Sequence, residues 1–284
     1  MIDVKGNNTF VLNCGGTLLN LAQPKIMGIV NITPDSFYDG GRYNSEIAIL
    51  KNIEKMLHDG ADIIDIGAVS TKPNAINVSI EEERIRLLSI VKAVKKQFPD
   101  CIISIDTFRS EIAADSIAEG ASMINDIYAG AFDENIFKIA ARNNIPIAMM
   151  HIQGTPKTMQ LNPSYSNVIT EVFDYFIERI AVAKSYGVKD ILVDVGFGFG
   201  KTLEHNYTLL KQLDYFELLG YPLLVGISRK SMIYKLLENT PQEALNGTTV
   251  LHTIALQNGA NILRVHDVKE AKECIKIVEM LKKN

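Results

Sequence analysis

Short apolar runs rich in isoleucine, valine and leucine alternate with longer segments of helical period from Lys25 to the end of the chain. A strand that is buried on both faces is apolar throughout, whereas an amphipathic helix repeats its apolar positions every 3.6 residues. The alternation therefore predicts repeated strand–helix units and a parallel sheet. The predicted strands, about eight in number, are Ile26–Val30, Ile63–Ile66, Ile102–Ile105, Met123–Ile124, Ile145–Met149, Ile191–Val193, Leu223–Gly226 and Ile262–Leu263.

Helices are predicted between most of these strands, and a glycine follows several of them, as C-terminal caps do. Eight strand–helix units are the number in a (β/α)8 TIM barrel, which typically needs ~250 residues. The 284 residues thus predict an α/β chain with one domain over residues 1–284. The predicted helices are Ser45–His58, Ile80–Gln97, Arg109–Glu119, Asn135–Asn143, Tyr165–Tyr186, Gln242–Asn258 and Val268–Lys282.

The first 24 residues are predicted to form a short N-terminal β-hairpin extension. Residues 9–21 alternate weakly in polarity around Gly15-Gly16, a pair that suits a tight turn. We expect this hairpin to close the bottom of the barrel.

An open doubly wound sheet also alternates strands and helices, and it is the rival architecture. Its dinucleotide fingerprint, G-x-G-x-x-G after a first strand, is absent from the sequence. The glycine run from Gly196 to Lys201 has too few residues before the lysine for a P-loop. We interpret this run as a loop over the pocket, where missing side chains let a flat ligand approach the backbone.

Composition excludes several classes of function. A formal charge of -4 with evenly scattered Lys and Arg argues against duplex nucleic acid as a partner. The three cysteines lie far apart without CxxC spacing, and the five histidines form no metal motif. With no signal-like N-terminus and no apolar run near the ~18 residues that span a bilayer, a cytoplasmic location without membrane contact is expected.

Polar residues follow the predicted strands, at the end where barrel enzymes carry their active sites. An isolated Asp in such a position is more often a helix cap, and Asp106 or Thr107 could cap the helix near Arg109. The recurrence of polar residues at successive strand ends favours a shared pocket. They are Asn31, Asp65 with Thr71 beyond it, Asp106, Asn125, His151, Asp194, Lys230, and Arg264 with His266.

The residue types in this set suggest a ligand with two parts. Asp106, Asn125, Asp194 and Lys230 suit the edge of a neutral heterocycle that has several N–H donors and a carbonyl. Arg264 could stack on such a ring while its charge faces an anion. Together Asn31, Arg264 and His266 would form a corner for a phosphate or diphosphate, and Mg²⁺ brought by a diphosphate needs only one or two protein oxygens, such as that of Asn31.

Two loops after the first two strands resemble mobile lids. Residues 27–43 carry Pro34, Phe37 and Gly40-Gly41, a composition typical of a loop that closes over a site. Residues 68–74 follow the second strand and are interpreted as a second lid.

Motifs spread over nearly the whole chain resemble those of the dihydropteroate synthase family of pterin-binding enzymes. They occur in the family's order: M-G-I-V-N-I-T-P-D-S-F at 27–37, S-I-D-T at 104–107, I-N-D at 124–126, M-H-I-Q-G-T-P-K-T-M-Q at 150–160, D-V-G-F-G-F-G-K at 194–201, S-R-K at 228–230 and R-V-H-D at 264–267.

The resemblance implies a role for each matching residue. A dihydropterin ring would be bound by Asp106, Asn125, Asp194 and Lys230, with Met150 lining the pocket and Arg264 stacking on the ring. Of these, Asp106, Lys230 and Arg264 would be catalytic. The diphosphate would lie on Asn31, Arg264 and His266, with magnesium at Asn31; the p-aminobenzoate side and the lids would comprise Phe37, Asp39, Thr71, Lys72, Pro73, Phe199 and Ser228.

The same resemblance implies a transferase of folate biosynthesis that is a target of sulfonamides. It would join 6-hydroxymethyl-7,8-dihydropterin diphosphate to p-aminobenzoate, giving 7,8-dihydropteroate and diphosphate, with Mg²⁺ assisting departure of the diphosphate. A homodimer through the late helices is also implied.

The second lid departs from the family pattern E-S-T-R-P-G. Val69 stands in place of the Glu, Lys72 of the Arg and Asn74 of the Gly, while Val195 replaces a common Pro. Lysine keeps the positive charge but loses the bidentate fork of arginine, so turnover or sulfonamide response could differ. Two alternatives stay open: a methyltransferase domain that binds methyltetrahydrofolate, and a catalytically silent pterin-binding paralogue.

Overall fold

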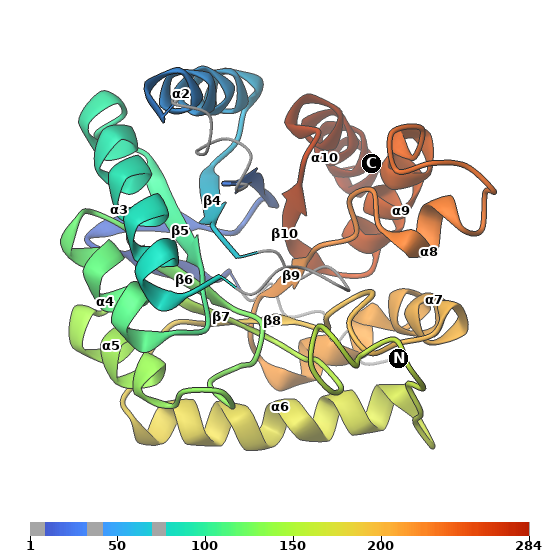
Figure 1. Ribbon diagram of the computed structural model, residues 1–284. Coiled ribbons are helices and arrows are strands. Elements are labelled where there is room, and N and C mark those ends of the chain that lie inside the picture. The colour runs from blue at the N-terminus through green and yellow to red at the C-terminus, as the bar shows by residue number, and fades with distance from the viewer. Residues whose placement is uncertain (1–8, 33–41, 70–77, 284) are drawn as a thin grey trace.

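The computed structural model describes residues 9–32, 42–69 and 78–283. Its eight parallel strands form a closed barrel in the order β10-β3-β4-β5-β6-β7-β8-β9, and the helices lie around the outside (Figure 1). The predicted TIM barrel is therefore confirmed. The barrel strands are β3 (Lys25–Asn31), β4 (Ile63–Gly67), β5 (Ile102–Asp106), β6 (Met123–Asp126), β7 (Ile147–Met150), β8 (Ile191–Asp194), β9 (Leu223–Val225) and β10 (Ala260–Val265).

All seven predicted helices are present, with most ends displaced by a few residues. One displacement has a clear cause, because the Asn167 side chain caps α6 by accepting from Ile169 N at 3.0 Å and starts the helix at Val168 rather than Tyr165. The helices outside the barrel are α2 (Arg42–Asp59), α3 (Ile80–Gln97), α4 (Ser110–Ala118), α5 (Asn135–Asn143), α6 (Val168–Ser185), α7 (Leu203–Lys211), the 3₁₀ helix η1 (Leu213–Leu219), α8 (Ser231–Tyr234), α9 (Leu245–Gln257) and α10 (Val268–Lys283).

Helices α7 and η1 were not predicted from the sequence. The capping box of α7 uses an unusual residue: Thr202 Oγ1 accepts from His205 N at 3.1 Å, while His205 Nδ1 accepts from Thr202 N at 3.2 Å. A Glu or Gln normally occupies the place of His205, and for that reason the helix start is easily overlooked.

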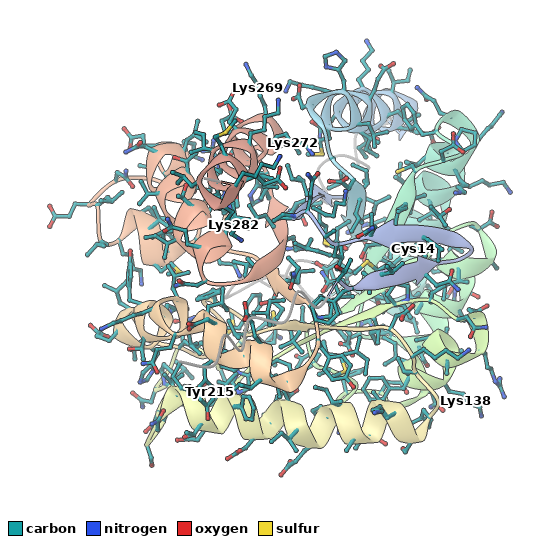
Figure 2. The ribbon with its side chains drawn as sticks, turned by 180° about the vertical axis from the view of Figure 1, so that it is seen from behind. Cys14, Lys138, Tyr215, Lys269, Lys272 and Lys282 are labelled. Carbon is teal, nitrogen blue, oxygen red and sulfur yellow. The ribbon has the colours of Figure 1, made fainter. Side chains whose placement is uncertain are left out.

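The N-terminal hairpin lies across the bottom of the barrel, as expected. Strands β1 (Val11–Cys14) and β2 (Thr17–Asn20) pair antiparallel around Gly15 and Gly16, both with positive φ (62° and 98°), as a two-residue turn requires. From behind, Figure 2 shows Cys14 on this hairpin. Buried hairpin side chains pack on residues in the lower part of the barrel strands, and the cluster contains Leu12, Cys14, Leu19, Leu21, Met27, Ile63, Ile102, Met123, Ala148, Leu192, Leu224 and Ile262.

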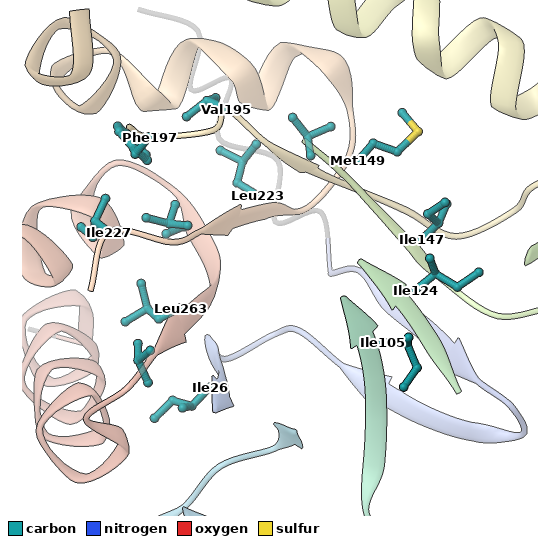
Figure 3. Packing of buried hydrophobic residues seen from close by; sticks show 14 of the residues in the cluster. Ile26, Ile105, Ile124, Ile147, Met149, Val195, Phe197, Leu223, Ile227 and Leu263 are labelled. Atoms are coloured by element: carbon teal, nitrogen blue, oxygen red, sulfur yellow. The ribbon is translucent and has the colours of Figure 1, made fainter. Parts of the chain in front are cut away.

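The main core lies between the strands and the surrounding helices. Figure 3 shows part of it, with Ile124 of β6 and Ile147 of β7 side by side, in agreement with their pairing in the sheet. Because apolar side chains fill the space around and below the barrel, the polar residues at the upper strand ends lie together at its C-terminal face. None of the described helices is long and apolar enough to cross a membrane.

Candidate active site

Arg264 on β10 joins two carboxylates at the barrel mouth. Its Nε donates to Asp65 Oδ2 at 2.7 Å, and its Nη2 donates to Asp106 Oδ2 at 2.7 Å. Asp65 is fully buried on β4, so its charge needs this partner. The arginine therefore links β10 to both β4 and β5.

Asn125 on β6 belongs to the same network. Its Nδ2 donates to Asp65 Oδ2 at 3.1 Å, and only 5% of the residue is exposed. Gly67 gives the neighbouring Asp106 its room, because a Cβ at Gly67 would lie 3.1 Å from the Asp106 Cβ. The predicted site residues Asp106 of β5, Asn125 of β6 and Arg264 of β10 thus lie together around Asp65.

Asp194 and Lys230 lie on the other side of the barrel mouth. Asp194 Oδ1 accepts from Gly196 N at 2.8 Å, and Lys230 Nζ donates to Phe197 O at 2.6 Å while lying 4.7 Å from the centre of the Phe199 ring. A Cβ built on Gly226 would lie 3.8 Å from Asp194 Oδ2 and 3.9 Å from Arg264 Cβ and Cδ. Gly226 therefore lies between these two charged groups, and a Cβ there would be at ordinary van der Waals distance from both.

Burial shifts the pKa values of three of these groups toward neutrality. It raises the pKa of Asp106 to about 7, opposed by Arg264 and assisted by Asp65. Burial also raises the pKa of Asp194, against the influence of Lys230. Lys230 has its pKa lowered to about 8 by burial, with Asp194 opposing and Arg264 assisting. Perturbed acids and a perturbed amine in one pocket are typical of an active site.

Two loops, the one after β9 and the one after β10, are joined to each other beside Lys230. Ser228 Oγ accepts from His266 N at 3.2 Å and lies 3.1 Å from His266 Nδ1. The next residue in each loop also forms a contact: Arg229 donates to both carboxylate oxygens of Asp267, at 2.7 and 2.9 Å. The predicted p-aminobenzoate and diphosphate residues Ser228 and His266 therefore lie in contact.

The remaining described candidates occupy strand ends. Met150 is buried at the end of β7 and pairs with Asp194 in the sheet register. Asn31 ends β3 and is exposed. Within residues 9–32, 42–69 and 78–283, no group of three or more His, Cys, Asp or Glu residues could hold a metal ion. The predicted lid residues Phe37, Asp39, Thr71, Lys72 and Pro73, and the departure at Asn74, lie outside the described residues.

Asp106 is no helix cap, in line with the favoured interpretation of the sequence, because it pairs with Arg264 and α4 starts without a side-chain cap. The glycine run also has a structural reason besides the ligand approach expected from the sequence, which stays a prediction. A Cβ at Gly196 would lie 2.0 Å from His151 O, and one at Gly200 would lie 2.5 Å from Gln153 O, so these glycines allow close approach to the chain after β7.

Two buried residues, Asp65 and Lys201, were assigned no ligand contact from the sequence. Asp65 anchors Arg264 and Asn125, and its signal was a charge inside the apolar run Ile63–Ile66. Lys201 is 2% exposed and its Nζ lies 2.9 Å from His151 Nδ1. In the sequence, its position after a glycine run suggested only the lysine of a P-loop, which the spacing excluded.

Known proteins provide an independent comparison. Residues 27–266 match the model of the family described as pterin binding enzyme. The chain is 47% identical over 266 residues to the dihydropteroate synthase of Escherichia coli K12, covering 93% of this chain and 94% of that one.

Solved structures give the same result. The Yersinia pestis dihydropteroate synthase in a sulfonamide drug complex superposes with a TM-score of 0.90 at 41% identity, over 97% of this chain and 100% of that one. The Xanthomonas albilineans dihydropteroate synthase in complex with 7,8-dihydropteroate has a TM-score of 0.86 at 34% identity, again over 97% and 100%.

Proposed function

This chain belongs to the family of pterin-binding enzymes, among the dihydropteroate synthases, and from this premise we propose how its barrel mouth performs the reaction. The substrates are 6-hydroxymethyl-7,8-dihydropterin diphosphate and p-aminobenzoate. The products are 7,8-dihydropteroate and diphosphate, as in folate biosynthesis.

One observation carries the assignment of the pterin to the mouth of the barrel. The buried side chains of Asn125 and Asp194 and the partly buried side chain of Asp106 converge there with Lys230 and Arg264. A pterin edge offers N–H donors and a carbonyl, and buried polar groups of this kind need partners of the opposite type. The carboxylates would accept from the ring, Asn125 can both donate and accept, and Lys230 would donate to the carbonyl.

The diphosphate is assigned to the corner formed by Asn31, Arg264 and His266. Arg264 supplies positive charge there, although its guanidinium also binds the carboxylates of Asp65 and Asp106. Mg²⁺ prefers oxygen ligands and usually keeps several waters, so the exposed amide of Asn31 fits as one protein ligand. The ion would neutralise charge on the departing diphosphate.

The transfer exchanges one bond for another at the pterin methylene carbon. The C–O bond to diphosphate breaks and its electron pair leaves on the diphosphate, while the amine nitrogen of p-aminobenzoate forms a C–N bond and releases a proton to solvent. Asp106 and Asp194 stabilise the positive charge that develops on the pterin. Phe199 and Ser228 would border the p-aminobenzoate. A sulfonamide, which resembles p-aminobenzoate, would compete there.

Purified protein should release diphosphate only when dihydropterin diphosphate, p-aminobenzoate and Mg²⁺ are all present. Binding of the pterin without release would instead favour the silent paralogue that the altered second lid raises. For the metal, Asn31→Ala should raise the Mg²⁺ concentration that gives half-maximal activity by about tenfold. An unchanged Mg²⁺ dependence would contradict the assignment of Asn31.

We also propose a homodimer through the late helices. Exposed apolar side chains on α9 and α10 support this, among them Val250 (50% exposed), Ile277 (61%) and Leu281 (63%). Light scattering of the wild type and of Ile277→Glu tests it, since the variant should be monomeric. The cytoplasmic location stays a prediction.

A further inference from the structure

Four consecutive carbonyl groups after β8, those of Phe197 to Gly200, each accept a hydrogen bond from a different side chain. The donors come from three separate parts of the chain, the loop after β7, the end of the glycine run and the loop after β9. In chain order of the carbonyls they are Lys230 Nζ at 2.6 Å, Gln160 Nε2 at 2.7 Å, Lys201 Nζ at 2.9 Å and Tyr165 OH at 2.7 Å.

The N–H groups of the same loop are also bound. Gly196 N donates to Asp194 Oδ1 at 2.8 Å, Gly198 N to Asn206 Oδ1 at 2.6 Å, and Phe199 N to Gly196 O at 3.1 Å. Glycines lose more conformational freedom on folding than other residues, so a segment with three of them in six residues needs external support to hold one shape. Here the side chains around it supply that support.

Lys201 is the most deeply buried of the four donors. Its Nζ has three polar neighbours: His151 Nδ1 at 2.9 Å, Phe199 O at 2.9 Å and His151 O at 3.4 Å. Lys201 thereby fastens the loop after β8 to the end of β7.

His151 is arranged to accept from Lys201. Only 6% of the residue is exposed, and its ring meets that of Tyr175 edge-on with centroids 4.9 Å apart. Burial and the nearby Lys201 lower the pKa of His151 to about 2, so the ring is neutral, and Nδ1 accepts from Lys201 in the tautomer that carries its proton on Nε2. Burial lowers the pKa of Lys201 as well, while Asp194 opposes that effect.

An amine without access to solvent costs free energy to bury, and Lys201 is only 2% exposed. What it holds is Phe199, whose ring lies 4.7 Å from the Lys230 ammonium. Moving the backbone of Phe199 would move this ring and change the surroundings of Lys230.

We infer that Lys201 is a positioning residue that sets the p-aminobenzoate side of the site by holding Phe199 against Lys230. The inference rests on the proposed function for the identity of that substrate. That Lys201 holds Phe199 in place does not depend on the proposed function.

Kinetics separate this role from general support of the fold. In Lys201→Met, the KM for p-aminobenzoate should rise about tenfold, because the buried hydrogen bond that holds Phe199 O is lost. The KM for dihydropterin diphosphate should change less than about twofold, since Lys230 loses an aromatic neighbour but keeps its hydrogen bond to Phe197 O, and Asp106, Asn125 and Asp194 still bind the ring. Lys189→Met is the matched control: Lys189 donates to Asn144 Oδ1 at 3.0 Å on the surface, and both KM values should stay unchanged.

Tyr165→Phe provides a milder variant if Lys201→Met does not fold. It removes only the hydroxyl that binds Gly200 O and keeps the ring that packs near His151 and His205. The KM for p-aminobenzoate should rise about threefold, in line with a neutral hydrogen bond. An equal rise in both KM values, in either variant, would overturn the inference.

A fluorescence measurement tests the loop without any substrate. The sequence contains no tryptophan, so Phe199→Trp introduces a single reporter at the position concerned. Adding Lys201→Met to this background should increase quenching of the tryptophan by iodide about twofold, because the loop opens locally. Adding Lys189→Met should leave it unchanged.

Unchanged quenching in a folded Lys201→Met reporter would show that Lys201 does not position Phe199. If that reporter is unfolded, the same comparison in Tyr165→Phe decides. A wild type that binds pterin but releases no diphosphate would reject the proposed function, whereas the quenching result would still report on the loop.

Discussion

Arg264 and Asp106 are joined by a 2.7 Å hydrogen bond between Nη2 and Oδ2, although 158 positions separate them in the chain. They lie on β10 and β5, with β3 and β4 between those strands in the barrel. The bond occupies an oxygen of the carboxylate that we assign to the pterin. A pterin can still bind Asp106 while the arginine stays in place, because each carboxylate oxygen can accept more than one hydrogen bond. Asp65 Oδ2 already does so, accepting from both Asn125 Nδ2 and Arg264 Nε.

Asp106→Asn should lower kcat/KM for dihydropterin diphosphate about 100-fold, because it removes the negative charge and keeps the shape. Release of diphosphate measures this. Asp115→Asn is the control, since Asp115 also binds an arginine, Arg84, at 2.7 Å but is 42% exposed. Near-normal turnover in the Asp106 variant would rule out its catalytic assignment.

The activity should depend on pH in two opposite ways. Asp106, with a pKa of about 7, loses its charge as the pH falls through that value, which breaks the ion pair with Arg264. Lys230, with a pKa of about 8, loses its ammonium charge as the pH rises through that value. The profile of kcat/KM should be bell-shaped with a maximum between the two values.

Lys230→Arg tests the alkaline limb of that profile. Arginine stays charged throughout the range, so whatever activity the variant keeps should no longer fall above about pH 8. An alkaline limb that persists in this variant would assign it to another group.

Arg109→Met should destabilise the fold by about 3–5 kcal/mol, because it leaves the carboxylate of Glu83 buried without its ionic partner. Glu83 is 0% exposed and is bound by Arg109 and by Thr107 Oγ1, the latter at 2.6 Å. Urea unfolding measures the loss.

Arg84→Met is the matched control for Arg109→Met. Arg84 pairs with exposed acids on the surface of α3 and α4, and such pairs contribute about 0–1 kcal/mol. Equal losses in the two variants would contradict the distinction between the buried and the surface pair.

Leu12→Ala should cost about 2–4 kcal/mol of unfolding free energy while leaving the KM values unchanged. Leu12 is 2% exposed in the cluster at the bottom of the barrel, far along the strands from the catalytic face. Leu18→Ala on the same hairpin removes a side chain that is 70% exposed, and it should cost less than about 0.5 kcal/mol. Altered kinetics in Leu12→Ala would mean that the hairpin influences the site.

Local patterns in the sequence determined the strands, most helices and the end of the barrel that carries the site. Apolar periodicity is a local signal in the sequence. The strand Ile63–Ile66 and the helix Asn135–Asn143 could therefore be predicted without knowing what packs against them. The polar strand ends followed from the same pattern, and family motifs gave them roles. The start of α7 was missed because His205 completes its cap in an unusual way.

The tertiary structure alone decided which of these groups bind one another. Asp65 meets Arg264 across 199 positions, and Lys201 meets His151 across 50, and no local period encodes either contact. Closure of the barrel brings β10 beside β3 and sets the stagger of the strands, which determines the distances between their ends. The sequence thus supplied the charged and polar side chains, and barrel closure selected their partners, because a buried charge is tolerated only where an opposite charge or a hydrogen-bond partner reaches it.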